Sequence, residues 1–133
     1  MKVIIAGSRD ITDRDLVYRA VAESGFEITE VVCGAARGAD CCGAHWGVDH
    51  GVPVKLFHPD WDKHGKAAGP IRNRQMAEYA DALILVWDGQ SKGSANMLNH
   101  AVACGLRVYE HNLARDESIQ QLAKAFDAPP EKP

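Results

Sequence analysis

The stretch Val31-Val32-Cys33-Gly34-Ala35-Ala36-Arg37-Gly38-Ala39-Asp40 joins an apolar run to a turn of small residues and then to a helix-like segment. This order is typical of a β-strand that leads through a glycine-rich turn into an α-helix. Small residues let the backbone come close to a ligand, and free N–H groups at the start of a helix attract anions. Arg37 adds a guanidinium that can contact phosphate. We therefore expect Gly34, Arg37 and Gly38 to bind a phosphate-bearing ligand.

Asp40 stands in the first turn of the expected helix. An acid at this position complements the helix dipole, which is a sufficient structural reason for its presence. Its carboxylate can also accept a hydrogen bond from a ribose hydroxyl or take part in catalysis, so Asp40 is our ligand-binding and candidate catalytic residue. The turn before it has neither the lysine and serine pattern of a P-loop nor the G-x-G-x-x-G spacing of a dinucleotide fingerprint.

Two further glycine-rich turns follow apolar runs, at 6–9 and at 88–94. In the first, the serine and the backbone N–H groups can hold phosphate while the arginine clamps it. In the second, Ser94 is the expected helix cap, and Asp88 is an alternative partner for ribose. Either turn can also be an ordinary strand-to-helix connection. The residues that these turns add to the expected ligand site are Gly7, Ser8, Arg9, Asp88, Gly89, Ser91, Gly93 and Ser94.

The segment Gly69-Pro70-Ile71-Arg72-Asn73-Arg74-Gln75-Met76 places two arginines near the start of a helix. Cations are disfavoured there by the helix dipole unless an anion binds between them and the free N–H groups. The two arginines are about 200° apart around a helix, so one ligand does not easily contact both. We assign Arg72 to the ligand and expect Met76, one turn later, to pack inward.

Apolar runs alternate with helix-like segments along the whole chain, which predicts an α/β fold. The expected strands lie at 3–6, 30–33, 54–57, 82–87 and 107–110. The first helix is expected to be capped by Thr12 and ended by Gly25, with later helices at 38–50, 70–79, 93–104 and 116–126. Because the strands are apolar on both faces, we predict a Rossmann-like, doubly wound parallel sheet of about five strands with helices on both faces.

The predicted domain spans residues 1–127 as a single Rossmann-like unit, and residues 128–133 form a tail that we expect to be disordered. Its longest irregular stretch is the polar loop 59–69. Within this loop Trp61 either stacks on a nucleotide base, with Lys66 near phosphate, or pins the loop to the core. We favour the second interpretation.

The chain has 133 residues and a formal net charge of −3, which argues against a protein that binds nucleic acid through bulk positive charge. No apolar segment has the roughly 20 residues needed to cross a bilayer, and the N-terminus does not resemble a signal peptide, so we expect a cytoplasmic protein without a membrane partner. The spacing of Cys33, Cys41, Cys42 and Cys104 matches no zinc pattern, which predicts reduced, structural cysteines and no metal site.

Four motifs in order, at Met1–Arg9, Gly34–Asp40, Gly69–Met76 and Trp87–Ser94, resemble those of the YspA-type proteins of the SLOG superfamily. That superfamily is named for the Smf/DprA and Lonely Guy proteins, and its YspA-type branch is common in bacteria and phages. The resemblance covers most of residues 1–112. It implies a Rossmann-like fold, a nucleotide or nucleotide-derived ligand, and a homodimer or homotetramer.

Three functions are compatible with the resemblance. The first is binding of a nucleotide-derived small molecule, without a cofactor, by a sensor or sequestering protein. The second is N-glycosidase activity like that of the Lonely Guy phosphoribohydrolases. Their P-G-G-x-G-T-x-x-E motif carries a catalytic glutamate where this chain has Asn96 and Met97, so Asp40 or Asp88 would have to replace it. The third is DprA-like binding of single-stranded DNA, which ranks lower because no row of stacking aromatics accompanies a basic groove.

Overall fold

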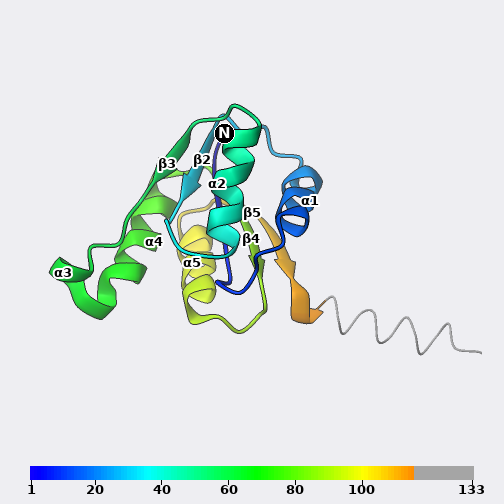
Figure 1. Ribbon diagram of the computed structural model, residues 1–133. Helices are drawn as coiled ribbons and strands as arrows, with labels where there is room; N and C mark the ends of the chain where they lie inside the picture. The colour runs from blue at the N-terminus through cyan, green and yellow to red at the C-terminus, as the bar shows by residue number, and fades with distance from the viewer. Residues whose placement is uncertain (116–133) are drawn as a thin grey trace, which may run out of the picture.

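The fold is a five-stranded parallel sheet with helices on both faces, seen in a computed structural model that describes residues 1–115 (Figure 1). The strands are β1 (Lys2–Gly7), β2 (Glu30–Cys33), β3 (Val54–Leu56), β4 (Ala82–Trp87) and β5 (Arg107–Asn112). The helices are α1 (Arg14–Ser24), α2 (Ala39–Asp49), α3 (Trp61–His64), the 3₁₀-helix η1 (Gly65–Ala67), α4 (Ala68–Tyr79) and α5 (Lys92–Ala103). The predicted Rossmann-like α/β class is confirmed.

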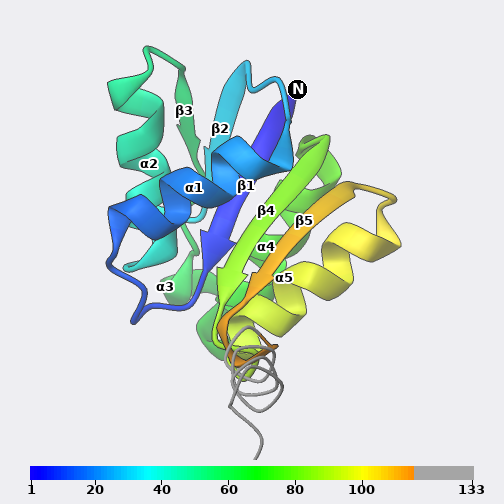
Figure 2. The ribbon, with the colours of Figure 1, turned by 90° about the vertical axis from the view of Figure 1, so that its right-hand side faces the viewer.

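The strand order is β3-β2-β1-β4-β5, and every neighbouring pair is parallel. Figure 2 shows the strands side by side, with all arrows pointing the same way. The chain builds one half of the sheet outward from β1 and then crosses to β4 for the other half. The carboxyl ends of β1, β2 and β4 therefore meet at one edge, where ligands bind in sheets of this topology.

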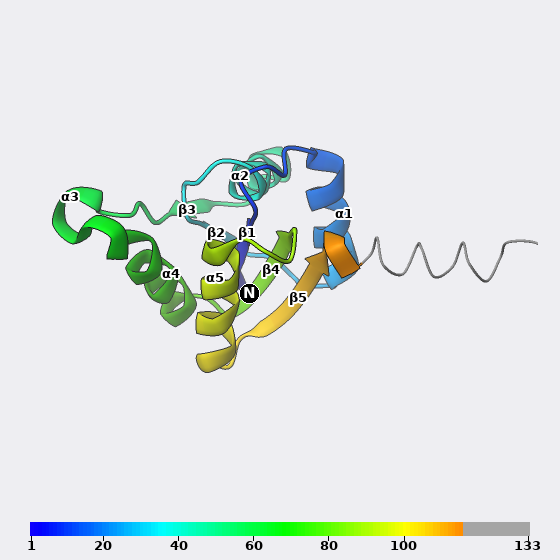
Figure 3. The same cartoon turned by 90° about the horizontal axis from the view of Figure 1, so that it is seen from below.

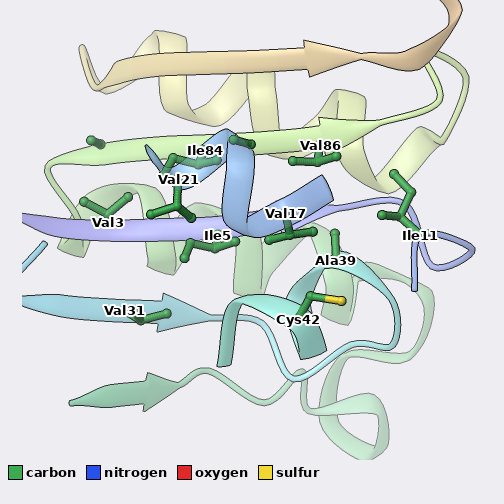
Figure 4. Close-up of a cluster of buried hydrophobic side chains, with 12 residues drawn as sticks. Val3, Ile5, Ile11, Val17, Val21, Val31, Ala39, Cys42, Ile84 and Val86 are labelled. Atoms are coloured by element: carbon green, nitrogen blue, oxygen red, sulfur yellow. The ribbon is translucent and has the colours of Figure 1, made fainter. Parts of the chain in front are cut away.

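Helices α1 and α2 cover one face of the sheet, and α4 and α5 cover the other (Figure 3). Alternate residues of each central strand point to opposite faces. On β1, Val3 and Ile5 pack toward α1 and α2 in the cluster of Figure 4, whereas Ile4 and Ala6 pack toward α4 and α5. Since both faces are covered, every residue of β4 is buried, and its sequence is an uninterrupted apolar run.

Two helix caps differ from the sequence prediction. The side chain of Asp13, rather than Thr12, caps α1, because its carboxylate accepts from the N–H groups of Asp15 and Leu16. Ser91, rather than Ser94, caps α5, and its Oγ accepts from the Ser94 N–H at 3.4 Å. In each case the chain offers two capping residues within one helical turn, and the helix begins after the one whose side chain reaches the free N–H groups. Gly25 ends α1 in a left-handed conformation, as predicted.

The segment predicted as an irregular loop at 59–69 is mostly helical. Asp60 caps α3 by accepting from the Lys63 N–H at 3.1 Å, η1 follows, and α4 begins at Ala68, two residues before the predicted Pro70. Proline is tolerated there because the first turn of a helix does not need its N–H. Trp61 is 52% exposed, so it does not pin this segment to the core, and that interpretation is wrong.

The predicted helix at 116–126, the domain end at 127 and the tail at 128–133 lie outside the described residues. Among residues 1–115, none of the helices has the length and apolar character that crossing a membrane requires. The four cysteines are free thiols, of which Cys33 and Cys42 are buried and Cys41 and Cys104 are exposed.

Candidate functional site

A cavity of about 420 Å³ lies at the carboxyl ends of β1, β2 and β4. Its walls come from the β1–α1 turn, the β2–α2 turn, α4 and the β4–α5 turn, so segments distant in the sequence share it. Its volume falls within the range of small-molecule sites. The residues that line it are Ala6, Gly7, Ser8, Arg9, Asp10, Ala36, Arg37, Asp40, Arg72, Asn73, Met76, Asp88, Ser91, Gly93, Ser94 and Met97.

Most residues assigned to the ligand from the sequence line this cavity. Three glycines do not: Gly34, Gly38 and Gly89. Gly34 and Gly38 nevertheless determine the shape of its wall. A Cβ on Gly38 would lie 2.4 Å from the carbonyl oxygens of Ser8 and Arg9, and the backbone there has a φ of +77°. Only glycine fits this close crossing of the β1–α1 and β2–α2 turns.

The Asp40 carboxylate is buried in the cavity wall at the start of α2 and is only 5% exposed. Its Oδ2 accepts a hydrogen bond from the Ala36 N–H at 3.4 Å, which ties the carboxylate to its own turn. Burial raises the pKa of Asp40 to about 6, although the Arg72 guanidinium and nearby backbone N–H groups favour the charged form. Asp40 is therefore a largely ionised, poorly solvated carboxylate at neutral pH, and a ligand can reach it.

Arg72 faces the same wall from α4. Its Nη1 donates to the carbonyl oxygen of Gly34, and its Nε donates to Asn73 Oδ1 at 2.9 Å. A Cβ on Gly34 would lie 2.7 Å from Arg72 Nη1 and 2.9 Å from Asp40 Oδ2, so the cation and the carboxylate converge on this glycine. Burial lowers the pKa of Arg72, and Asp40 acts in the opposite direction.

Arg74, two residues later, points away from the cavity. Its side chain is 70% exposed and pairs with Glu78 at 2.9 Å. Of the two arginines of this segment, only Arg72, which we assign to the ligand, lines the cavity. The helix begins earlier than predicted: α4 starts at Ala68, so Arg72 lies beyond its first turn.

The β4–α5 turn contributes an acid of a different kind. Asp88 Oδ1 accepts from the N–H groups of Gln90 and Ser91 at 2.8 and 2.9 Å, and these bonds lower the pKa of Asp88. Its own N–H donates to Ser8 Oγ at 3.0 Å, which joins the ends of β1 and β4. Asp88 and Ser8 thus shape the turn as well as lining the cavity.

Several features of the cavity suit an anion. The guanidinium groups of Arg9, Arg37 and Arg72 line it, together with the N-terminal turns of α2 and α5. The N–H groups of Lys92 and Gly93, at the start of α5, have no acceptor within the helix, and a Cβ on Gly93 would meet nothing within 4 Å. The space beside Gly93 is therefore open, and free N–H groups at a helix start favour anions.

Sequence reasoning missed six of the lining residues as ligand contacts: Ala6, Asp10, Ala36, Asn73, Met76 and Met97. Met76 packs inward as predicted and is buried. Asn73 is the polar member of the group that is buried, at 6% exposure. Its spacing from Met76 and Ala77 was an available signal, because it places an amide on the buried face of the helix.

The residues of the segment at 61–67 do not line the cavity, so Trp61 and Lys66 are not in contact with it. Asn96, at the position where Lonely Guy enzymes carry an acid, accepts a hydrogen bond from Asn73 Nδ2 at 3.1 Å. Within residues 1–115, no three His, Cys, Asp or Glu side chains gather closely enough to hold a metal ion.

The fold is Rossmann-like, and the cavity at its strand ends is lined by three arginines and three aspartates. Residues 1–64 match the model of the YspA, cpYpsA-related SLOG family. A similar protein is the Gene 61 protein of Mycobacterium phage D29, which is 34% identical over 117 residues, covering 80% of this chain and 93% of the relative. No solved structure gives a significant match. The chain belongs to the YspA-type, cpYpsA-related branch of the SLOG superfamily.

Proposed function

We propose that the protein binds a phosphorylated, nucleotide-derived small molecule in the cavity and acts as a sensor or sequestering protein. The observation that carries this proposal is the convergence of Arg9, Arg37 and Arg72 with the N-terminal turn of α5 on one cavity of about 420 Å³. Guanidinium groups and free backbone N–H groups are the two protein donors best suited to phosphate. Membership of the SLOG superfamily is consistent with a nucleotide-related ligand.

Asp40 is the proposed partner of the sugar. A carboxylate accepts hydrogen bonds from two neighbouring hydroxyl groups, and Asp40 is ionised at neutral pH and reachable from the cavity. Asp88 already accepts two N–H groups of its own turn, at 2.8 and 2.9 Å, whereas Asp40 accepts the Ala36 N–H at 3.4 Å, so we prefer Asp40. The ligand would then lie with its phosphate toward the arginines and its ribose toward α2.

A thermal-shift panel of nucleoside mono-, di- and triphosphates, cyclic nucleotides and nucleotide sugars tests this proposal. A ligand at 100 times its dissociation constant stabilises the folded state by about 2.7 kcal/mol, which is readily measured. We expect at least one phosphorylated nucleoside to raise the melting temperature of the wild type by clearly more than that of Arg72→Ala. No shift with any of them would contradict the proposal.

A second candidate function, hydrolysis of a nucleoside phosphate N-glycosidic bond, is favoured by one observation. Asp40 supplies a buried carboxylate in the cavity, which is the group that such chemistry needs beside the positively charged sugar of the transition state. Water would give its oxygen to C1′ and a proton to the leaving base. Release of free base from AMP, followed by chromatography, tests it; release at an unchanged rate from Asp40→Asn would remove Asp40 from that role.

The predicted homodimer or homotetramer and the predicted lack of nucleic-acid binding remain proposals. Light scattering coupled to size-exclusion chromatography tests the first. Gel retardation of a single-stranded oligonucleotide at low salt tests the second, because phosphate contacts are strongest there.

A further inference from the structure

Asn73 connects three parts of the cavity wall through one buried amide. Its Oδ1 accepts from Arg72 Nε at 2.9 Å. Its Nδ2 donates to the carbonyl oxygen of Gly93 at 3.3 Å and to Asn96 Oδ1 at 3.1 Å. The amide therefore bonds an arginine of α4 on one side and the first turns of α5 on the other.

The bonding pattern requires an amide at this position. Arg72 Nε–H donates to this residue, whereas the Gly93 carbonyl and Asn96 Oδ1 accept from it, and a primary amide supplies both functions in one plane. A carboxylate would provide only acceptors. Among buried polar side chains of the described residues none lacks a hydrogen-bond partner, so a change at Asn73 would leave groups unpaired.

The same bond limits how Arg72 can move. An arginine side chain has several rotatable bonds and loses up to about 2 kcal/mol of conformational freedom when it is fixed. Bonds at Nε and Nη1, to Asn73 and to the Gly34 carbonyl, hold the guanidinium at two points before any ligand arrives. Such a preorganised guanidinium binds an anion with less entropic cost.

We infer that Asn73 is a positioning residue, which orients the Arg72 guanidinium and fixes it relative to the N-terminal turn of α5. The two anion-binding elements of the cavity then act as one unit. The consequence for ligand affinity rests on the proposed function, whereas the orientation of Arg72 is a property of the free protein.

Proton exchange of the Arg72 Nε–H in the ligand-free, ¹⁵N-labelled protein tests the orientation directly, with the resonance assigned by its loss in Arg72→Lys. We expect Asn73→Ala to accelerate this exchange about tenfold, because a hydrogen bond to a charged group is removed. Asn73→Asp retains the acceptor and should keep the exchange slow. Asn96→Ala, which removes only the bond on the far side, should change it less than Asn73→Ala does.

Unchanged exchange in a folded Asn73→Ala variant would overturn the inference. If the alanine variant does not fold, Asn73→Ser serves instead, since its shorter side chain does not span from Arg72 to α5. Circular dichroism and urea unfolding establish which variants are folded.

A double-mutant cycle with inorganic pyrophosphate as the probe tests the consequence for binding. We expect Asn73→Ala to weaken pyrophosphate binding about tenfold in the wild-type background and less than about twofold in Arg72→Ala, because its effect acts through the arginine. Equal losses in both backgrounds would contradict a positioning role. Failure of the wild type to bind pyrophosphate or any nucleotide would contradict the proposed function, and the exchange measurement would still decide the role of Asn73.

Discussion

The β2–α2 turn and the β4–α5 turn have similar sequence patterns, but their aspartates lie in different environments in the structure. Each follows a buried strand, contains glycines and one aspartate, and leads into a helix. Asp88 of the β4–α5 turn bonds its own backbone, and its pKa is lowered. Asp40 of the β2–α2 turn is buried beside Arg72, and its pKa is raised to about 6.

The difference comes from what packs on each turn. The β2–α2 turn is crossed by the β1–α1 turn at Gly38 and contacted by Arg72 of α4 at Gly34. These contacts exclude water from Asp40. The β4–α5 turn has open space at Gly93, and the N–H groups of Gln90 and Ser91 favour the charged form of Asp88. Asp88 is thus a partly exposed acid held by the N–H groups of its own turn, whereas Asp40 is a buried acid beside an arginine of another helix.

The largest expected difference between the two turns is the effect of replacing a glycine on the free energy of unfolding. Gly38→Ala would put a Cβ 2.4 Å from two carbonyl oxygens at a φ of +77°, and we expect a loss of about 3 kcal/mol or more in the free energy of unfolding. Gly93→Ala, in open space at the start of α5, should be neutral or slightly stabilising. Urea unfolding of both variants measures this. Equal losses would show that the two turns are equally constrained.

The pH dependence of stability should have opposite signs at the two aspartates. The folded-state pKa of Asp40 is raised, so the stability conferred by its proton is complete below about pH 4 and is lost as the pH rises through 6. Relative to Asp40→Asn, the wild type should lose up to about 3 kcal/mol between pH 4 and pH 7.5. Relative to Asp88→Asn, it should instead lose stability on acidification, because the pKa of Asp88 is lowered.

Urea unfolding at a series of pH values gives both differences. Asp40→Asn keeps an oxygen that can accept from the Ala36 N–H, so the comparison isolates the charge. A difference between the wild type and Asp40→Asn that does not change with pH would mean that the pKa of Asp40 is the same in the folded and unfolded states, which would contradict the raised value.

The β2–α2 turn, unlike the β4–α5 turn, is contacted by the guanidinium of Arg72 from α4. Arg74, on the same helix, provides a matched control variant. Arg72→Ala should weaken binding of a phosphorylated ligand by about 10- to 100-fold, as expected for loss of a charged hydrogen bond. Arg74→Ala removes only an exposed pair with Glu78 and should change affinity and stability by less than about 0.5 kcal/mol. Isothermal titration with the nucleotide found by thermal shift compares them, and equal affinities of the two variants would remove Arg72 from the ligand.

The smallest expected effect concerns the helix caps. Ser91 caps α5 through its side chain, whereas Gly38 at the start of α2 has no side chain to do so. Ser91→Ala should therefore cost about 1 kcal/mol of stability. Chemical denaturation of the variant and the wild type measures it. A Ser91→Ala variant as stable as the wild type would mean that backbone contacts alone fix the start of α5.

The strands were the most predictable part of the fold. Their apolar runs predict β2 and β4 to the residue, because strands covered on both faces have little choice of composition. Helix starts were less accurate, since Thr12 and Asp13, or Ser91 and Ser94, are chemically able to cap the same helix. Local sequence does not say which of the two adopts the capping geometry.

The sequence predicts most of the residues that line the cavity, but it does not predict which of the two aspartates is buried. The glycine-rich turns indicate which strand ends carry polar groups, and the shared sheet edge brings them together. Asp40 and Asp88 remained alternatives for the sugar, because their solvation depends on packing by segments distant in the sequence. Asn73 was missed since its three hydrogen bonds join residues of α4 and α5 that only the tertiary structure brings together.

Mass spectrometry of small molecules released from the purified wild-type protein and from Arg72→Ala tests the central claim most directly. The proposed function predicts a nucleoside-containing phosphate that co-purifies with the wild type, or is retained after incubation with a nucleotide pool, and is strongly depleted in a folded Arg72→Ala. Release of no such molecule under either condition, or equal amounts from both proteins, would contradict it.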